Sequence, residues 1–230
     1  MGKLKSLANL LGAFEDFVAK ARELGDEMNG TIDVTPIDES GEAQTVQGRK
    51  RLTAKRHQVH TIEQRVQKII ELVRKAKVDP YVQRATAGVL NRKCGDDWCV
   101  PEKDHTAEIR AIFTYVREHV RYMADPKNLD TFRAPRHTMR PVEDGGFAGG
   151  DCDDVCSVLA SMLLIAGYSV KLRIMSVPPN PKGAWTHIFV RCGLPQRAPT
   201  KWISLDATLN KAPGFDPSRL ANATRDFDVS

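Results

Sequence analysis

The sequence has no apolar run that is long enough to cross a membrane. A spanning helix needs roughly 20 consecutive apolar residues, and the longest apolar stretch of this 230-residue chain is much shorter. The amino-terminal segment also lacks the pattern of a secretory signal peptide, because Glu15, Asp16 and Lys20 interrupt what would be its apolar core. We therefore expect neither a membrane span nor a signal peptide.

Cysteine is scarce as well, with five residues in the chain. An odd number leaves at least one thiol unpaired if disulfides form, and a reducing compartment is the default expectation. Cys94, Cys99 and His105 make only part of a metal site, because a structural zinc normally takes four ligands in paired short spacings. No second pair exists. We interpret Cys94 and Cys99 as two free thiols or, in oxidising surroundings, as a small disulfide.

A strong charge of either sign is also missing. The net charge is +5 and the isoelectric point is near 9.0, which permits contact with nucleic acid or an anionic wall polymer without requiring it. Basic residues gather in 49–57, but no aromatic residue alternates with them as base stacking would need. A solvated linker is therefore the favoured interpretation of this cluster, and nucleic-acid contact is the alternative.

The pattern divides the chain into four parts. Residues 1–28 contain apolar side chains at helical spacing and predict an amphipathic helix, which packs on its own domain or docks onto a partner. Residues 29–56 are polar and read as a linker. Residues 57–215 form the main domain, which begins with three further helices, and residues 216–230 form a carboxy-terminal tail.

The main domain is organised around Gly149-Gly150-Asp151-Cys152-Asp153-Asp154 and the apolar run that follows to Ala166. The glycine pair allows a tight turn, and the run predicts a buried helix that starts at Cys152. A thiol at a helix amino terminus is biased towards the nucleophilic thiolate by the macrodipole. The three aspartates oppose this as anions, unless they bind Arg or Lys or an ion pair with His187 outweighs them. An inert buried cysteine is the alternative.

The pattern then changes to alternation, which predicts strands over 168–174, 185–192 and 201–206. We expect the last two to pair as an antiparallel hairpin with His187 opposite Asp206. This register also sets Ile188 opposite Leu205 and Val190 opposite Ile203, on one apolar face. Directly opposed residues have Cβ atoms about 5 Å apart. Asp206 is therefore predicted to contact the His187 ring.

Cys152, His187 and Asp206 thus occur in the order nucleophile, base and orienting acid. Each has a simpler interpretation alone: a core thiol, a histidine bonded to a backbone carbonyl, or an aspartate that starts a turn. Their joint placement favours catalysis. Cys156, one helical turn further on, is expected in the core, and Cys192 has no base in reach.

These residues resemble the transglutaminase-like superfamily of papain-related cysteine enzymes. The resemblance covers roughly residues 60–212 and rests on motifs in Gly150–Asp154, Trp185–His187 and Trp202–Thr208, with Val120–Tyr122 and Asp125-Pro126 before them. It implies an α+β fold with a nucleophile helix packed on an antiparallel sheet, here with a helical amino-terminal extension. It also implies a Cys152–His187–Asp206 triad and acyl transfer from peptide or glutamine amides through a thioester, with no cofactor or metal.

The motifs are most similar to versions encoded by tailed bacteriophages and prophages. That similarity implies a virion-associated protein, found in the virion or the host cytoplasm, which acts on a protein or cell-wall peptide. Other virion proteins would bind residues 1–30. The chain lacks the extra β domains of the larger transglutaminases, which favours hydrolysis over cross-linking. The alternative is a catalytically silent structural or adaptor virion protein that keeps this fold.

Overall fold

The computed structural model describes residues 61–125, 131–143 and 146–229. Residues from Ile62 onward form one compact unit. The predicted amphipathic helix in 1–28, the linker 29–56 and the basic cluster 49–57 lie outside the described residues. Within the described part of the chain, no helix is long and apolar enough to span a membrane.

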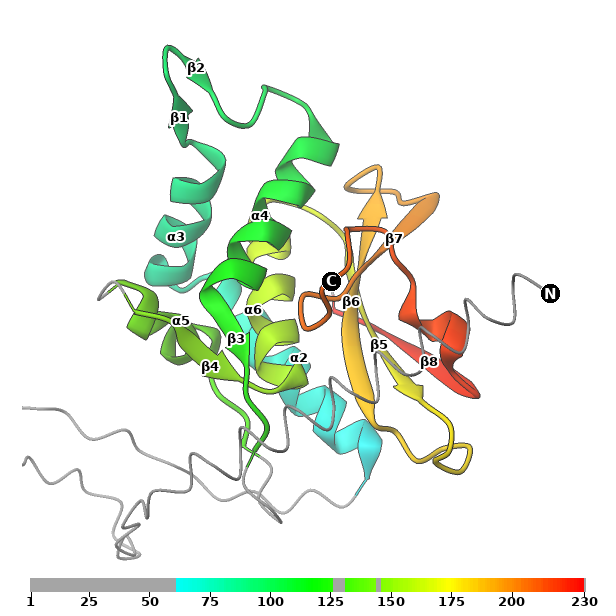
Figure 1. Ribbon diagram of the computed structural model, residues 1–230. Coiled ribbons are helices and arrows are strands. Elements are labelled where there is room, and N and C mark those ends of the chain that lie inside the picture. Colours follow the sequence, from blue (N-terminus) through cyan, green and yellow to red (C-terminus); the bar gives the residue numbers. More distant parts are fainter. Residues whose placement is uncertain (1–60, 126–130, 144–145, 230) are drawn as a thin grey trace, which may run out of the picture. The chain divides into compact units, whose positions relative to one another are not determined.

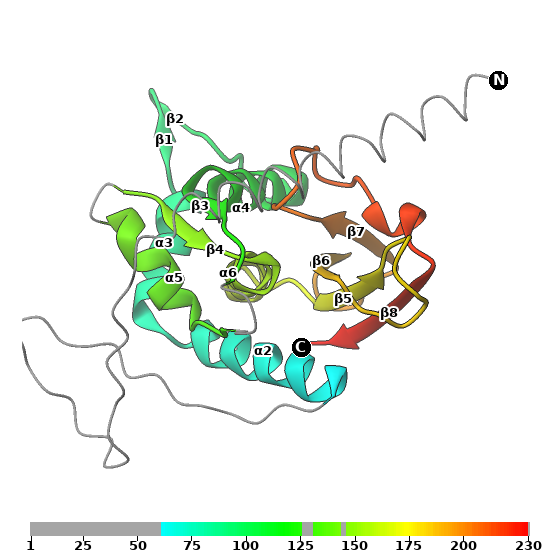
Figure 2. The same cartoon turned by 60° about the horizontal axis from the view of Figure 1, so that its bottom comes forward.

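Helix α6 (Cys152–Ile165) occupies the centre of this unit, between other helices and a sheet (Figure 1). Every residue from Asp154 to Leu164 is buried. Figure 2 shows the remaining helices grouped around α6 on one side and the main sheet on the other. The α+β fold that the sequence predicted, with the Cys152 helix packed on an antiparallel sheet, is therefore confirmed.

The first two described helices, α2 and α3, form where the apolar periodicity predicted helices. Helix α2 (Ile62–Lys77) buries Val66, Ile69, Ile70 and Val73 along one stripe. Asp79-Pro80 then interrupts the chain, and α3 (Pro80–Leu90) begins at the proline, where a missing backbone N–H costs nothing. The Asp79 side chain caps α3 by accepting a hydrogen bond from the Tyr81 backbone N–H at 2.8 Å.

The next region contains more secondary structure than the sequence predicted. The periodicity predicts a helix over 106–122, but helix α4 (His105–His119) ends three residues earlier, because Val120–Tyr122 forms strand β3. Strand β3 pairs in parallel with β4 (Ala148–Gly150). The segment between Asp125-Pro126 and Gly149, in which the sequence predicts a loop, also contains helix α5 (Pro135–Glu143). Its polar residues and internal proline give no helical periodicity of apolar side chains.

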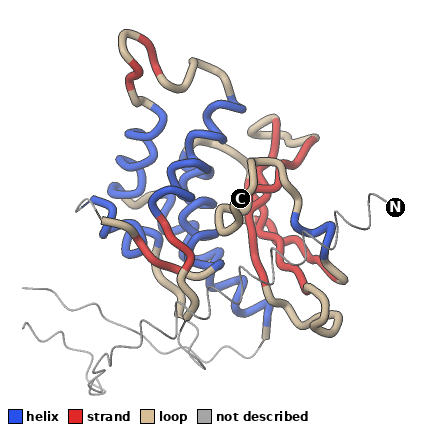
Figure 3. Tube along the Cα trace, in the orientation of Figure 1, coloured by secondary structure: helices blue, strands red, loops and turns tan. Residues whose placement is uncertain are grey.

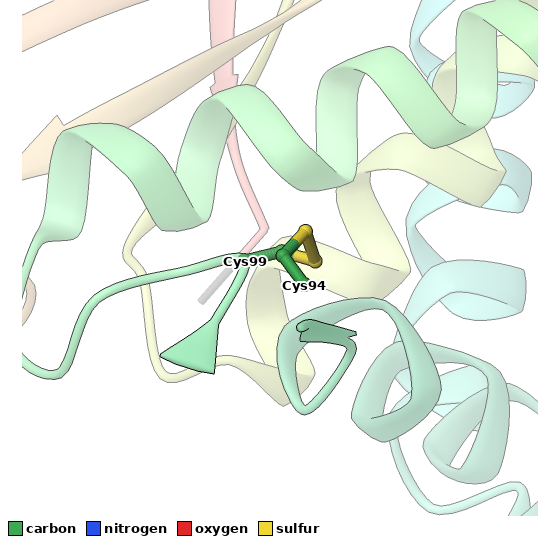
Figure 4. The surroundings of a disulfide bond; sticks show 2 residues. All are labelled: Cys94 and Cys99. Carbon is green, nitrogen blue, oxygen red and sulfur yellow. A yellow bond between two sulfur atoms is a disulfide. The ribbon is translucent and has the colours of Figure 1, made fainter. Parts of the chain in front are cut away.

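A small hairpin between α3 and α4 carries the first two cysteines. Strands β1 (Lys93–Cys94) and β2 (Asp97–Trp98) are antiparallel, and a disulfide joins Cys94 to Cys99 (Figure 4). The disulfide is one of the two alternatives that the sequence left open. Trp98 is half exposed, and the Lys93 ammonium lies 3.7 Å from the centre of its ring.

The main sheet has the strand order β7-β6-β5-β8 with antiparallel neighbours throughout, and Figure 3 shows the strands in red beside the blue helices. Its strands are β5 (Val170–Ser176), β6 (His187–Leu194), β7 (Lys201–Leu205) and β8 (Ala223–Asp228). The first three match the predicted strands within about two residues. Strand β8 was not predicted, because it is an exposed edge strand in which polar side chains hide the alternation. A short 3₁₀ helix at Pro217–Leu220 precedes it.

The register between β6 and β7 differs from the predicted one by two residues. Val190 pairs with Leu205 and Cys192 with Ile203, so the prediction that placed Ile188 opposite Leu205 is wrong. A shift of two keeps every side chain on its predicted face, because the side-chain period of a strand is two. The apolar pattern fits both registers, and only the geometry of the connecting loop distinguishes them.

Gly149 and Gly150 lie in strand β4 and allow close approach, whereas the sequence predicted that they form a tight turn. A Cβ atom on Gly149 would lie 2.5 Å from Cε of Met123. On Gly150 it would lie 2.5 Å from Cβ of Asp154, in the first turn of α6. The absence of a side chain at Gly150 therefore lets the strand pass directly over the helix that carries Cys152.

We predict that Gly150→Ala destabilises the protein by about 1–3 kcal/mol, the usual cost of overpacking. The measurement is the free energy of unfolding from chemical denaturation. Gly88→Ala is the matched control: Gly88 lies in α3, and a Cβ atom there would have no neighbouring atom within 4 Å, so alanine should stabilise by up to about 1 kcal/mol. Equal stability of Gly150→Ala and the parent protein would contradict the close packing of β4 on α6.

Candidate active site

Cys152 is the first residue of α6, and it lies against the sheet. The Asp151 side chain caps the helix by accepting hydrogen bonds from two backbone N–H groups of the first turn. The backbone N–H of Ile188, in strand β6, acts on the Cys152 thiol and favours its thiolate form. The start of α6 therefore meets the sheet next to His187, as the sequence predicted, and Cys152 is partly exposed there.

His187 and Asp206 are joined by a short hydrogen bond. His187 Nε2 lies 2.7 Å from Asp206 Oδ2, and the two side chains are only 9% and 2% exposed. The shifted register means that His187 reaches Asp206 diagonally across the strands, which is still within side-chain range. The predicted contact is thus present, although the predicted direct opposition is not.

The other oxygen of Asp206 is also fixed. Asp206 Oδ1 accepts hydrogen bonds from the Thr208 hydroxyl at 2.6 Å and from its backbone N–H at 3.1 Å. Burial alone would lower the pKa of His187 and raise that of Asp206. Their mutual attraction outweighs burial, so the pKa of His187 is raised and that of Asp206 is lowered. The pair therefore favours an imidazolium beside a carboxylate.

The second nitrogen of the His187 ring is left for proton exchange. Nε2 donates to the Asp206 carboxylate, and Nδ1 forms no hydrogen bond with any described residue. The ring lies 6.3 Å from that of Phe189 at an angle of 24°. The backbone N–H of Ile188, the next residue in the strand, acts on the Cys152 thiol, so Nδ1 is the ring nitrogen that a nearby thiol could use.

The backbone N–H of Cys152 is available as an oxyanion donor. The first four N–H groups of a helix have no partner within the helix, and the Asp151 side chain takes those of Asp153 and Asp154. Within the described chain, the N–H of Cys152 forms no hydrogen bond. It lies at the positive end of α6, where a developing negative charge is stabilised.

Three aspartates surround Cys152, and each is held differently. Asp151 is the helix cap. Asp154 is buried with its Oδ2 3.0 Å from Arg133 Nε, and its Oδ1 accepts from the Arg133 backbone N–H at 3.2 Å. Burial outweighs this cation and raises the pKa of Asp154 to about 7. Burial and the neighbouring Asp151 raise the pKa of Asp153 to about 10, so Asp153 is neutral at pH 7.

These surroundings keep the Cys152 thiol protonated in the free protein. Burial raises its pKa well above the ordinary value, and Asp151 and Asp153 raise it further, while the Ile188 N–H acts in the opposite direction. The sequence left open whether the helix macrodipole or the carboxylates prevail, and here burial and the carboxylates raise the pKa of this thiol. A reaction at this sulfur requires a base that removes the proton as the new bond forms.

The remaining free cysteines have no such base. Cys156 is buried, as the sequence predicted, Cys192 is buried as well, and burial raises the pKa of both thiols. Oxygen atoms of the three aspartates near Cys152 lie within 4.8 Å of one another, a spacing that suits a cation. However, Asp151 already caps the helix and Asp154 is paired with Arg133, so existing contacts explain why two of these carboxylates face this point.

The sequence did not identify Arg133 or Ile188 as parts of the site. Arg133 also donates from Nη1 to the Gly149 carbonyl at 2.8 Å, so it supports both the strand and the helix that meet at Cys152. Its only signal was its position in a long segment before the cysteine motif. Ile188 contributes a backbone group, which no residue pattern reveals.

Comparison with known proteins supports this class of site. Residues 97–207 match the Transglutaminase-like superfamily. None of the curated proteins matches. The chain therefore contains a transglutaminase-like superfamily domain, and that domain includes all three predicted site residues.

Several solved structures are similar to parts of this chain. A candidate protease from Parabacteroides distasonis has 16% identity and a TM-score of 0.39, with 60% of this chain and 29% of that chain covered. A candidate cysteine protease from Cytophaga hutchinsonii has 13% identity and a TM-score of 0.40, with 70% and 51% covered. A TGase has 12% identity and a TM-score of 0.34, with 71% and 39% covered. The match thus spans only part of each longer chain.

The His187–Asp206 pair gives a direct titration test. In a Cys152→Ala background, we expect the imidazole of His187 to titrate above about 6.5, the ordinary histidine pKa. Asp206→Asn should move it below that value, because burial then acts without the compensating charge. Imidazole C–H resonances measured by NMR report the change. Asp216→Asn, which alters the cap of a distant 3₁₀ helix, is the control and should leave His187 unchanged.

The Arg133–Asp154 contact predicts a pH-dependent stability effect. The pKa of Asp154 is raised from 3.8 to about 7 in the folded protein, so burying this carboxyl costs stability progressively from about pH 4 to pH 7. Above pH 7 the folded protein carries the Asp154 carboxylate, and Arg133 reduces the cost of that charge. Arg133→Gln should therefore lower the melting temperature more at pH 8.5 than at pH 5.5. In an Asp154→Asn background the effect of Arg133→Gln should not depend on pH. The same loss at both pH values in the parent protein would contradict the assignment.

Proposed function

We propose that this domain is a cysteine hydrolase or acyltransferase that acts on amide bonds through Cys152, His187 and Asp206. One observation carries the proposal: His187 is hydrogen-bonded to Asp206, and the next residue in the strand, Ile188, has a backbone N–H that acts on the Cys152 thiol. A buried His–Asp pair alone would be a structural contact. Its position beside a partly exposed thiol at a helix amino terminus supports catalysis.

The proposed reaction begins with a neutral His187 ring. The Cys152 sulfur attacks the amide carbonyl while its proton moves to His187 Nδ1, and the resulting oxyanion accepts a hydrogen bond from the Cys152 N–H. The C–N bond then breaks as His187 returns the proton to the leaving amine, which leaves a thioester. Water, or another amine, attacks the thioester with His187 again as base. Asp206 holds the ring and stabilises the imidazolium.

The raised pKa of His187 sets the expected pH dependence. The base must be neutral before the attack, so kcat/KM should rise as the pH increases through this raised pKa. A thiol held protonated by burial fits a base that acts during the attack, because no preformed thiolate is needed. A bound substrate that displaces water from the site would still allow the Cys152 thiol proton to move to His187.

Substrate and biological setting are also part of the proposal. A protein or cell-wall peptide is the proposed acyl donor, and water is the proposed acceptor. The resemblance of the motifs to phage-encoded versions supports an association with a virion, with residues 1–30 as the proposed contact to other virion proteins. A nucleic-acid contact through residues 49–57 is the less favoured addition.

A catalytically silent adaptor is the second candidate function. The observation that favours it is the raised pKa of the Cys152 thiol, which a purely structural cysteine would share. The two functions differ in one property: only an enzyme needs His187 to increase the reactivity of the sulfur.

Alkylation by iodoacetamide at pH 8, with mass-spectrometric mapping, tests this difference. We predict that Cys152 reacts at least about tenfold faster than Cys156 and Cys192, which are buried, and that His187→Gln slows Cys152 by about tenfold or more. The His187→Gln variant preserves access to the sulfur and removes the base. Phe189→Leu, a change in the same strand, is the control and should retain most of the rate. If Cys152 reacts equally fast with and without His187, the adaptor function is correct.

A further inference from the structure

A groove lies between helix α4 and the segment that follows strand β7. It has a volume of about 420 Å³. Its walls come from two parts of the chain that are about 90 residues apart in sequence. The lining residues are Thr106, Ile109, Arg110, Thr114, Arg117, Ile203, Asn210, Lys211, Ala212 and Pro213.

The charges that line this groove are all positive. Arg110 and Arg117 come from α4 and Lys211 from the opposite wall, and the lining residues include no carboxylate. Arg110 forms no ion pair with any described residue and is exposed. Arg117 donates from Nη1 to the backbone carbonyl of Lys211 at 3.3 Å, a contact that ties the two walls together without neutralising either charge.

Both walls are connected to the candidate active site. Lys211 lies five residues after Asp206, and just beyond it the chain returns to strand β7, where the Gly214 backbone N–H donates to the Ser204 carbonyl at 2.9 Å. On the other wall, α4 runs directly into β3, which pairs with the strand that leads to Cys152. A ligand in the groove would therefore lie against the elements that position the triad residues.

We propose that this groove binds an acidic segment of the polypeptide substrate. The inference rests on the proposed function, and it adds the class of substrate. Carboxylates of the substrate would pair with Arg110, Arg117 and Lys211, since guanidinium and ammonium groups are suited to them. Thr106, Thr114 and Asn210 would supply hydrogen bonds to its backbone, and Ile109, Ile203 and Pro213 provide an apolar floor for its side-chain stems.

The composition of the groove favours a peptide over a nucleic acid. Proteins that bind single-stranded nucleic acid combine cations with aromatic side chains on which bases stack. No aromatic residue is among the described residues that line this groove. Apolar aliphatic side chains beside cations instead match the mixed character of an acidic peptide.

Binding of a labelled peptide tests the proposal independently of catalysis. The full-length protein carries Cys152→Ala, and the probe is a fluorescein-labelled (Glu-Ser)6 peptide, with (Gly-Ser)6 and the oligonucleotide dT12 as comparisons. Fluorescence anisotropy gives the affinities. We expect (Glu-Ser)6 to bind more tightly than either comparison, and the double variant Arg110→Glu/Lys211→Glu to weaken it by about fivefold to twentyfold. The affinity should also fall as salt increases.

The matched control makes the same change of charge elsewhere. Lys75 and Arg84 are exposed on helices α2 and α3 and do not line the groove, so Lys75→Glu/Arg84→Glu should leave the affinity within about twofold. Equal weakening by both double variants would overturn the proposal in favour of general attraction, and so would the absence of peptide binding. Tighter binding of dT12 with the same dependence on Arg110 and Lys211 would assign the groove to nucleic acid. Because binding is measured without the Cys152 thiol, failure of the alkylation test would reject the enzyme while leaving this result valid.

Discussion

Complete burial of helix α6 is the constraint on which the rest of this domain depends. Its residues from Asp154 to Leu164 have no exposed face, so the helix cannot lie on a surface and needs cover on every side. Helices on one side and the antiparallel sheet on the other provide it. This arrangement leaves the amino-terminal end of the helix as the part where polar groups reach solvent. The helix residues that follow Cys152 are inside the core, and Cys152 therefore lies at the edge of the core.

The same burial determines the electrostatics of the site. Carboxylates in the first turn suit a helix dipole, but here they are removed from water, and burial raises the pKa of Asp153 and Asp154. Arg133 offsets the charge of Asp154, while Asp153 is held neutral. Among the described aspartates of this site, only Asp206 combines burial with a lowered pKa, because His187 and Thr208 both donate hydrogen bonds to it. The structure thus stabilises a buried carboxylate at Asp206, which orients His187, and does not stabilise one at Asp153, next to Cys152.

Sequence patterns predicted the elements that bury apolar residues and missed those that do not. The central helix and three strands carry strong periodicity, and their order alone suggested that Cys152, His187 and Asp206 converge. Helix α5 and strand β8 were missed because polar residues mask their period. The hairpin register was wrong by two residues because both registers give the same faces. Whether a thiol is ionised depends on burial and on backbone donors such as Ile188, which the sequence does not encode locally.

The distribution of charge also bears on how a substrate would be oriented. Carboxylates surround Cys152, whereas the charged residues that line the groove beside α4 are all cations. An acidic segment placed at the sulfur would meet Asp151 and would raise the pKa of the thiol further, which opposes attack. The same segment in the groove would be attracted. A substrate whose acidic residues lie away from the reacting amide would be attracted by the groove and would not be repelled at Cys152. A substrate with acidic residues at that amide would be repelled at Cys152 and would gain no attraction from the groove. The position of charge relative to the reacting bond, more than its total amount, would therefore govern selectivity.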